Sequence, residues 1–174
     1  MGDEPFVVTV KRALLDQIWT DPLRWQDLAI FDFKPEQVHR LTIKTDKELE
    51  LVRDAKNQWT WAKGGGAVNQ TNLQTLLHAL STLHAVEWVG GTLPGHGFDK
   101  PQAVITFTTS PDDKSAHKLT IGGTAPNGNW FAKVDERDGT FVISAADLNA
   151  LKSPLAAQQS PTPAPPASAM ATPR

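Results

Sequence analysis

The chain has 174 residues, with 17 Lys or Arg against 19 Asp or Glu, and its formal net charge is −2. This balance lacks the basic excess that indicates nucleic-acid binding, and no apolar run approaches the ~18 residues of a membrane span. Because the chain contains no Cys, a disulfide framework, a thiol nucleophile and a cysteine zinc site are excluded.

Residues 1–35 form an amino-terminal segment that resembles the end of the chain's core. The segment has an apolar run followed by helix-spaced apolar residues, and the same order returns later: Phe6-Val7-Val8-Thr9 with Leu15 and Ile18, then Phe141-Val142-Ile143-Ser144 with Leu148 and Leu151. We therefore expect a strand and a helix that close a preceding repeat. No charged-then-apolar signal segment follows Met1, which fits a cytosolic protein or a soluble piece of a longer chain.

Residues 36–100 are expected to form a first repeat unit. Apolar side chains alternate along three short strands, at Leu41 and Ile43, Leu49 and Leu51, and Trp59 and Trp61. The polar turns between them are short, which favours antiparallel neighbours. A helix follows, with one apolar stripe of Leu73, Leu76, Leu77, Leu80 and Leu83. Asn69 or Thr71 is its expected cap, and Gly90-Gly91 ends the segment.

Residues 101–153 are expected to form a second repeat unit. Alternation recurs at Ala103, Ile105 and Phe107, at Leu119 and Ile121, at Trp130, Ala132 and Val134, and at Phe141 and Ile143. Asn127-Gly128 and Asp138-Gly139 are turn signals, and a short helix covers about Ala145 to Lys152. The predicted fold is α+β, with two repeated antiparallel three-stranded meander-plus-helix units forming a two-layer sheet/helix domain.

Residues 154–174 form a Pro/Ala-rich end with six Pro and six Ala, no aromatic residue and one charge, on Arg174. Such a segment buries too little apolar surface to offset its ordering entropy, so a disordered tail is expected.

Several short motifs across residues 5 to 153 resemble those of the domain of unknown function 4340 family. They are Leu28-Ala29-Ile30-Phe31-Asp32-Phe33, Val38 through Ile43, Trp59, the leucine helix, Gly97-Phe98-Asp99-Lys100-Pro101, Ile121-Gly122 and Trp130-Phe131-Ala132-Lys133. Phe98 stands where Leu is usual in the family, and Trp130-Phe131 stands where Tyr is common. Both differences keep the apolar or aromatic character.

The resemblance implies a bacterial envelope protein with a membrane anchor and tandem copies of the domain. Some such proteins are encoded with, or fused to, ABC-transporter auxiliary proteins of the gliding-motility type. The family has no established catalytic residues, so none is carried over. We expect such an anchor to lie outside this chain. We therefore expect a soluble fragment of an anchored extracytoplasmic protein, with a cytoplasmic location left open.

Catalytic signals are weak in this chain. The histidines lack the i, i+4 spacing that places two metal ligands on one helical face: His39, His78, His84, His96 and His117. No Gly-x-Ser-x-Gly elbow occurs. Folding could pair acidic residues such as Asp32, Glu36, Glu87 and Asp99, but the sequence does not show their separation. We therefore expect no catalytic residue, no cofactor and no metal.

The chain has six Trp and no Tyr. Trp59 and Trp61 share one strand face and are expected in the core. Exposed Trp can anchor a protein partner or stack on a sugar, although packing is the commoner role. The candidate interaction residues are Trp19, Trp25, Trp88 and Trp130.

These observations favour a non-catalytic extracytoplasmic interaction or scaffold domain, auxiliary to an envelope ABC-type transport system. Its expected partner is a protein or a neighbouring repeat, bound through an apolar patch or an unpaired strand edge. We expect no nucleic acid, and membrane contact only through the missing anchor; the oligomeric state stays open. A glycan- or peptidoglycan-binding module that uses exposed Trp is the first alternative, and a carboxylate-based hydrolase the second.

Overall fold

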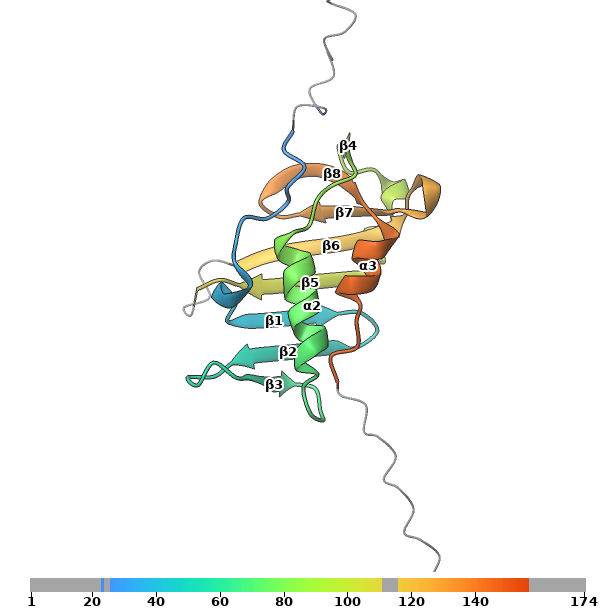
Figure 1. The fold of residues 1–174 in the computed structure, drawn as a ribbon. Helices are drawn as coiled ribbons and strands as arrows, with labels where there is room; N and C mark the ends of the chain where they lie inside the picture. The colour runs from blue at the N-terminus through green and yellow to red at the C-terminus, as the bar shows by residue number, and fades with distance from the viewer. Residues whose placement is uncertain (1–22, 24–25, 111–115, 157–174) are drawn as a thin grey trace, which may run out of the picture.

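The computed structural model describes residues 23, 26–110 and 116–156. In these residues eight strands form one sheet, in the order β3-β2-β1-β5-β6-β7-β8-β4 (Figure 1). Every neighbouring pair in the sheet is antiparallel. Together with two α-helices, this sheet confirms the predicted α+β class.

The strands are β1 (Arg40–Lys44), β2 (Glu48–Arg53), β3 (Trp59–Lys63), β4 (Glu87–Gly90), β5 (Ala103–Thr108), β6 (Ala116–Thr124), β7 (Trp130–Val134) and β8 (Arg137–Ile143). The helices are α2 (Gln70–Ser81) and α3 (Ala145–Leu151). Short 3-10 turns lie at η2 (Pro35–Gln37), η3 (Pro94–His96) and η4 (Pro126–Gly128).

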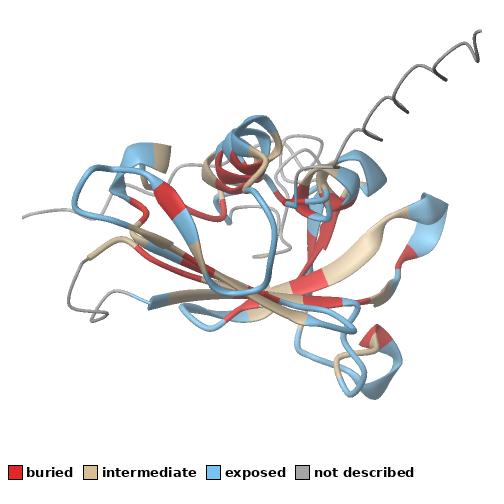
Figure 2. Ribbon diagram, turned by 90° about the horizontal axis from the view of Figure 1, so that it is seen from below, coloured by how far each residue is buried: buried red, intermediate tan, exposed pale blue. Residues whose placement is uncertain are grey.

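Both helices lie on the same face of the sheet (Figure 2). Strand alternation directs one set of side chains toward them, as Ile105 and Phe107 show on β5. The leucine stripe of α2 meets this set, and Leu73, Leu76 and Leu80 are fully buried. The other face of the sheet, here called the open face, carries mainly charged residues and threonines. This two-layer arrangement matches the predicted sheet/helix architecture.

The predicted layout of two three-stranded units is not confirmed, because the strands of both halves join in one sheet through the β1–β5 pair. In addition, β4 was missed. The helix expected from the stripe Leu73 to Leu83 ends at Ser81. Glu87–Gly90, for which no strand was expected, forms a strand beside β8. The turn expected at Asp138-Gly139 lies instead at Asp135 and Glu136, and both expected turn residues belong to β8.

The two ends of the chain fall largely outside the described residues. The strand and helix expected between Phe6 and Ile18 lie there, as do residues 157–174 of the expected tail. The first residues of that tail pack onto the domain, since Leu155 is buried and Ala156 bridges to Val68. Within the described part, no helix has the length and apolar character needed to span a bilayer.

Candidate interaction surface

The strand β4 forms one edge of the sheet (Figure 1). It pairs with β8 through Glu87↔Val142 and Trp88↔Phe141, and no described strand pairs with its outer side. An edge strand of this kind presents backbone groups that another chain can pair with. The opposite edge of the sheet is β3.

The side chain of Trp88 fixes β4 to the body of the domain. Its ring centroid lies 5.2 Å from that of Phe141, and its indole N–H donates a 3.1 Å hydrogen bond to the Asp27 carbonyl oxygen. The Arg137 guanidinium donates to the carbonyl oxygens of Asp27 and Ala29, at 3.4 and 3.0 Å. These contacts hold the incoming chain near β4.

The loop that leaves β4 is fixed on the open face. Its His96 is buried and stacks on Phe131 of β7, with the ring centroids 4.3 Å apart. Next to it, Gly97 has a left-handed backbone and packs against the backbone of Gly123 on β6. The loop at Gly97, the strand β6 at Gly122-Gly123 and the strand β7 at Phe131, which all lie in or next to motifs of the family resemblance, therefore meet at one corner of the sheet. Packing at this corner explains their residue types.

Exposed apolar side chains concentrate around β4. Four large hydrophobic residues in the described part are exposed, and each lies on β4, immediately before it, on the loop after it, or on the segment bonded to its approach: Val89 (41%), Val86 (51%), Leu93 (60%) and Leu28 (45%). The Ala85 N–H donates to the Leu28 carbonyl oxygen at 2.7 Å. Leu28 therefore lies next to the segment that leads through Val86 into β4. We call Leu28, Val86, Val89 and Leu93 the β4 edge patch.

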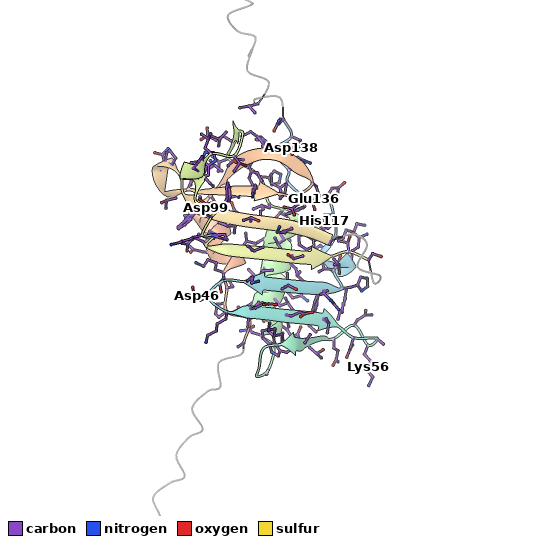
Figure 3. All side chains as sticks on the ribbon, turned by 180° about the vertical axis from the view of Figure 1, so that it is seen from behind. Asp46, Lys56, Asp99, His117, Glu136 and Asp138 are labelled. Atoms are coloured by element: carbon purple, nitrogen blue, oxygen red, sulfur yellow. The ribbon has the colours of Figure 1, made fainter. Side chains whose placement is uncertain are left out.

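Away from the β4 loop and Phe131, the open face, which Figure 3 views with its side chains, has oppositely charged side chains that pair. Lys63 lies 3.0 Å from Glu48 between β3 and β2, and Lys118 lies 3.2 Å from Asp135 of the β7–β8 turn. A hydrogen bond from Lys63, and then its positive charge, lower the pKa of the Glu48 carboxyl. Paired, exposed charges of this kind form a solvated face, so the β4 edge patch differs from the remainder of the sheet.

The structure describes two of the four candidate tryptophans. Trp88 is only 7% exposed and belongs to the core, and Trp130 is partly buried against it. Trp19 and Trp25 lie outside the described residues. A partner contact by any of them stays a prediction. Trp59 is buried and Trp61 partly buried against the core, as predicted.

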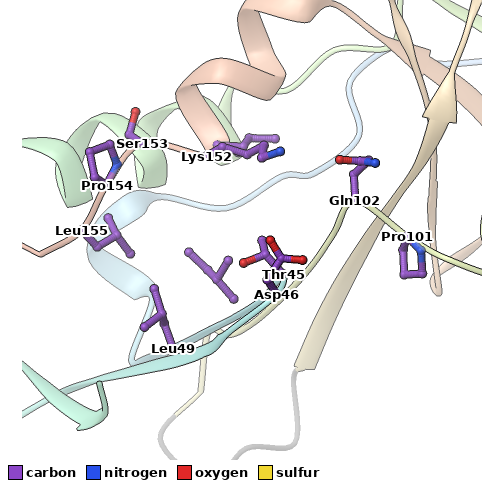
Figure 4. A pocket seen from close by; sticks show the side chains of 11 residues that line it. Thr45, Asp46, Leu49, Pro101, Gln102, Lys152, Ser153, Pro154 and Leu155 are labelled. Carbon is purple, nitrogen blue, oxygen red and sulfur yellow. The ribbon is translucent and has the colours of Figure 1, made fainter. Parts of the chain in front are cut away.

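The pocket in Figure 4 has a volume of about 280 Å³ and lies between the β1–β2 turn and the end of α3. One carboxylate, Asp46, and one ammonium group, Lys152, line it. The acidic residues considered for hydrolysis are not gathered there. Glu36 and Asp99 line two other hollows, each without a second carboxylate. The described residues contain no group of three or more potential metal-ligating side chains placed to hold an ion.

The contact between Thr109, His117 and Glu136 was not predicted from the sequence. His117 Nδ1 lies 2.7 Å from a Glu136 oxygen, and His117 Nε2 lies 3.4 Å from the Thr109 hydroxyl. The imidazole is stacked on Phe107 with centroids 4.9 Å apart. The hydroxyl contact is long for a nucleophile–base pair, and the stacking gives the ring a packing role. The three residues meet only through strand pairing across β5, β6 and the β7–β8 turn.

The β4 edge patch was also missed, and its local signal is weak. Val86 and Trp88 flank Glu87 directly before Gly90-Gly91, but the apolar Val89 interrupts the alternation that is typical of a strand.

Comparison with known proteins gives one family. The model of a family described as Domain of unknown function (DUF4340) matches the chain twice in tandem, at residues 1–96 and 90–169. This supports the internal repeat and leaves the role open. The search of curated proteins and the search of solved structures each find no match.

Proposed function

We propose that this chain, which belongs to the DUF4340 family, is a non-catalytic interaction domain that binds a protein partner along β4. The observation that carries the proposal is the placement of the exposed large apolar residues: among those described, all four form the β4 edge patch. An edge strand flanked by exposed apolar side chains suits the addition of an extended partner segment.

Two features of β4 support this proposal: a backbone edge without a described strand neighbour, and exposed apolar side chains beside it. On its outer side, β4 has no described strand neighbour. Val89 on β4 and Val86 directly before it are both exposed. A partner strand would pair with the backbone while its own side chains cover the two valines. Each apolar side chain removed from water on binding contributes about 25 cal/mol per Å².

We also place the domain outside the cytoplasmic membrane, in association with an envelope transport system. What supports this location is the resemblance of the sequence to envelope proteins. A fusion of the protein to alkaline phosphatase, which is active only outside the cytoplasm, tests it. Phosphatase activity in intact cells is expected, and a fusion that is produced at full length but shows no phosphatase activity would contradict it.

The interaction itself is tested by site-specific photo-crosslinking in cells that produce the protein. A photoreactive amino acid replaces Val89 on the β4 edge or, as the control, Lys44 on the open face. Both positions are exposed, at the edge and in the interior of the sheet respectively. A discrete cross-linked product is expected at position 89 and not at position 44.

A second variant shows whether the product depends on the patch. Val86→Lys places a charge in the apolar surface and should abolish the product formed at position 89. The proposal fails if no product forms at position 89, or if positions 44 and 89 give the same products.

A further inference from the structure

The two edges of the sheet are compatible with one another. Because the sheet has eight strands and every neighbouring pair is antiparallel, β3 and β4 run in opposite directions. A second copy placed beside the first in the same orientation therefore brings its β3 antiparallel to β4 of the first copy. In that arrangement the helices of both copies lie on the same side of one continuous sheet.

The side chains of the two edges also match in one register. On β3, Trp61 faces the helices and Thr60 and Lys63 face the open side, since Lys63 pairs with Glu50. On β4, Trp88 pairs with Phe141 and faces the helices, Glu87 faces the open side, and Val89 lies at the register shift between Trp88 and Gly90. Placing Thr60 opposite Val89 sets Trp61 opposite Trp88.

This register also brings opposite charges together. The bulge in β3 after Trp61 puts Lys63 beside Glu87 of the other copy. Lys63 and Glu87 are both exposed in the single chain, where Lys63 also pairs with Glu48. Opposite charges across a strand pair stabilise it, and β-branched pairs such as Thr60 and Val89 pack well there.

We propose that the partner of the β4 edge is β3 of a second copy of this chain, so that copies join head to tail into a continuous antiparallel sheet. This rests on the proposed function, because it uses the same β4 surface. A contact between two different edges does not close on itself, so each copy keeps one free edge and assembly is open-ended. A two-fold β4–β4 dimer is the rival, and one of its registers sets Glu87 opposite itself.

The test uses two variants that each block one edge. Val89→Glu introduces a charge at the β4 edge, and Thr60→Glu does so at β3. Both side chains are exposed, so each variant should keep its far-UV circular dichroism spectrum and its unfolding midpoint. Thr75→Glu is the matched control, because Thr75 is an exposed threonine on α2. The state of association is measured by sedimentation velocity over a wide range of concentrations.

The unmodified chain and Thr75→Glu should form oligomers that grow with concentration. Each blocked variant alone should sediment as a monomer. An equal mixture of the two blocked variants should give a one-to-one dimer and nothing larger, because only one intact β3 and one intact β4 can meet in it.

Other outcomes overturn the inference. If Thr60→Glu dimerises alone, the contact is β4 to β4, and if the unmodified chain stays monomeric, the partner is not a second copy. In either case a cross-linked product at position 89 in cells would still support β4 as the contact surface. Loss of that product as well would end the proposed function.

Discussion

Gly122 lies where the loop after β4 meets the sheet. A Cβ at this position would overlap the His96 carbonyl oxygen and would come within 2.9 Å of the Phe98 ring. At Gly97, a Cβ would lie 2.7 Å from the Gly123 backbone nitrogen. Because backbone atoms cannot yield as a flexible side chain can, the loop reaches the sheet only through these glycines.

The substitution Gly122→Ala should therefore destabilise the domain by about 1–3 kcal/mol, the usual cost of forcing an atom into a packed site. Urea denaturation followed by circular dichroism measures the change. Gly65→Ala is the control, because a Cβ there meets nothing within 4 Å. An unchanged midpoint for Gly122→Ala would show that the loop does not pack on β6 as described.

The ion pair between Glu48 and Lys63 gives a pH prediction. Lys63 lowers the pKa of Glu48, so the pair stabilises the fold above the ordinary pKa of the carboxyl and that contribution is lost as pH falls through the lowered value. Lys63→Met should move the pKa of Glu48 up toward its ordinary range, as measured by carbon NMR of the side-chain carboxyl. Lys118→Met, which breaks a different pair, should leave it unchanged; equal shifts in both variants would refute the assignment.

The Asp138-Gly139 pair has the residue types of a turn, but both residues belong to a strand. Gly139 has a positive φ of 122°, as a turn glycine would, yet it lies within β8. A Cβ there would lie 3.2 Å from the Gly90 carbonyl oxygen and 3.6 Å from the Trp88 ring. Glycine is required by the approach of β4, a strand far away in the sequence, so no local pattern could reveal it.

Among the elements, α2 was the easiest to predict because its leucine stripe is local. Its end was not predictable from the same stripe. Leu83 continues the spacing and is buried, but the helix stops at Ser81 and Leu83 reaches the core from the following turn. The start followed the capping rule, with the Asn69 side chain accepting a hydrogen bond from the Asn72 N–H at 3.1 Å.

Replacing this cap should weaken α2 measurably. Asn69→Ala removes the acceptor and should reduce the free energy of unfolding by about 1 kcal/mol. Asn69→Asp keeps an acceptor at the same position and should recover most of the loss. Thermal unfolding of the two variants measures the difference, and equal losses would mean that the side-chain acceptor is not what matters.

The strand β4 was the hardest element to predict. It has four residues and ends in glycine, and its identity depends on pairing with Phe141 and Val142 at the other end of the chain. The candidate surface was missed for the same reason. Sequence reasoning anticipated a contact through an unpaired strand edge, but it assigned Trp88 as a contact residue, whereas long-range pairing turns that side chain inward and leaves the valines outside.

At the scale of the molecule, the two family matches do not correspond to two separate bodies. The last strand of the first match, β4, crosses to the far edge and pairs with β8 of the second. The pair β1–β5 joins the halves again at the centre of the sheet. The repeat was visible in the sequence, but the crossing was not, because strand order within a sheet depends on contacts between distant segments.

Interlocked halves should unfold together. We expect one cooperative transition in urea, with the same midpoint for tryptophan fluorescence and for far-UV circular dichroism. The tryptophans sample both halves, since Trp59 lies on β3 and Trp130 on β7. Two separated midpoints would indicate that the halves are independent units.

The account as a whole depends on β4 being the surface that a partner covers, and thiol accessibility tests this most directly. The chain has no cysteine, so Val89→Cys and, as the control, Lys44→Cys each introduce one reactive group. Maleimide labelling is compared between the dilute purified chain and cells that produce the protein. Labelling at position 89 should be fast in the dilute chain and strongly slowed in cells, with position 44 labelled at similar rates in both. Equal rates for position 89 in the two settings would contradict the account.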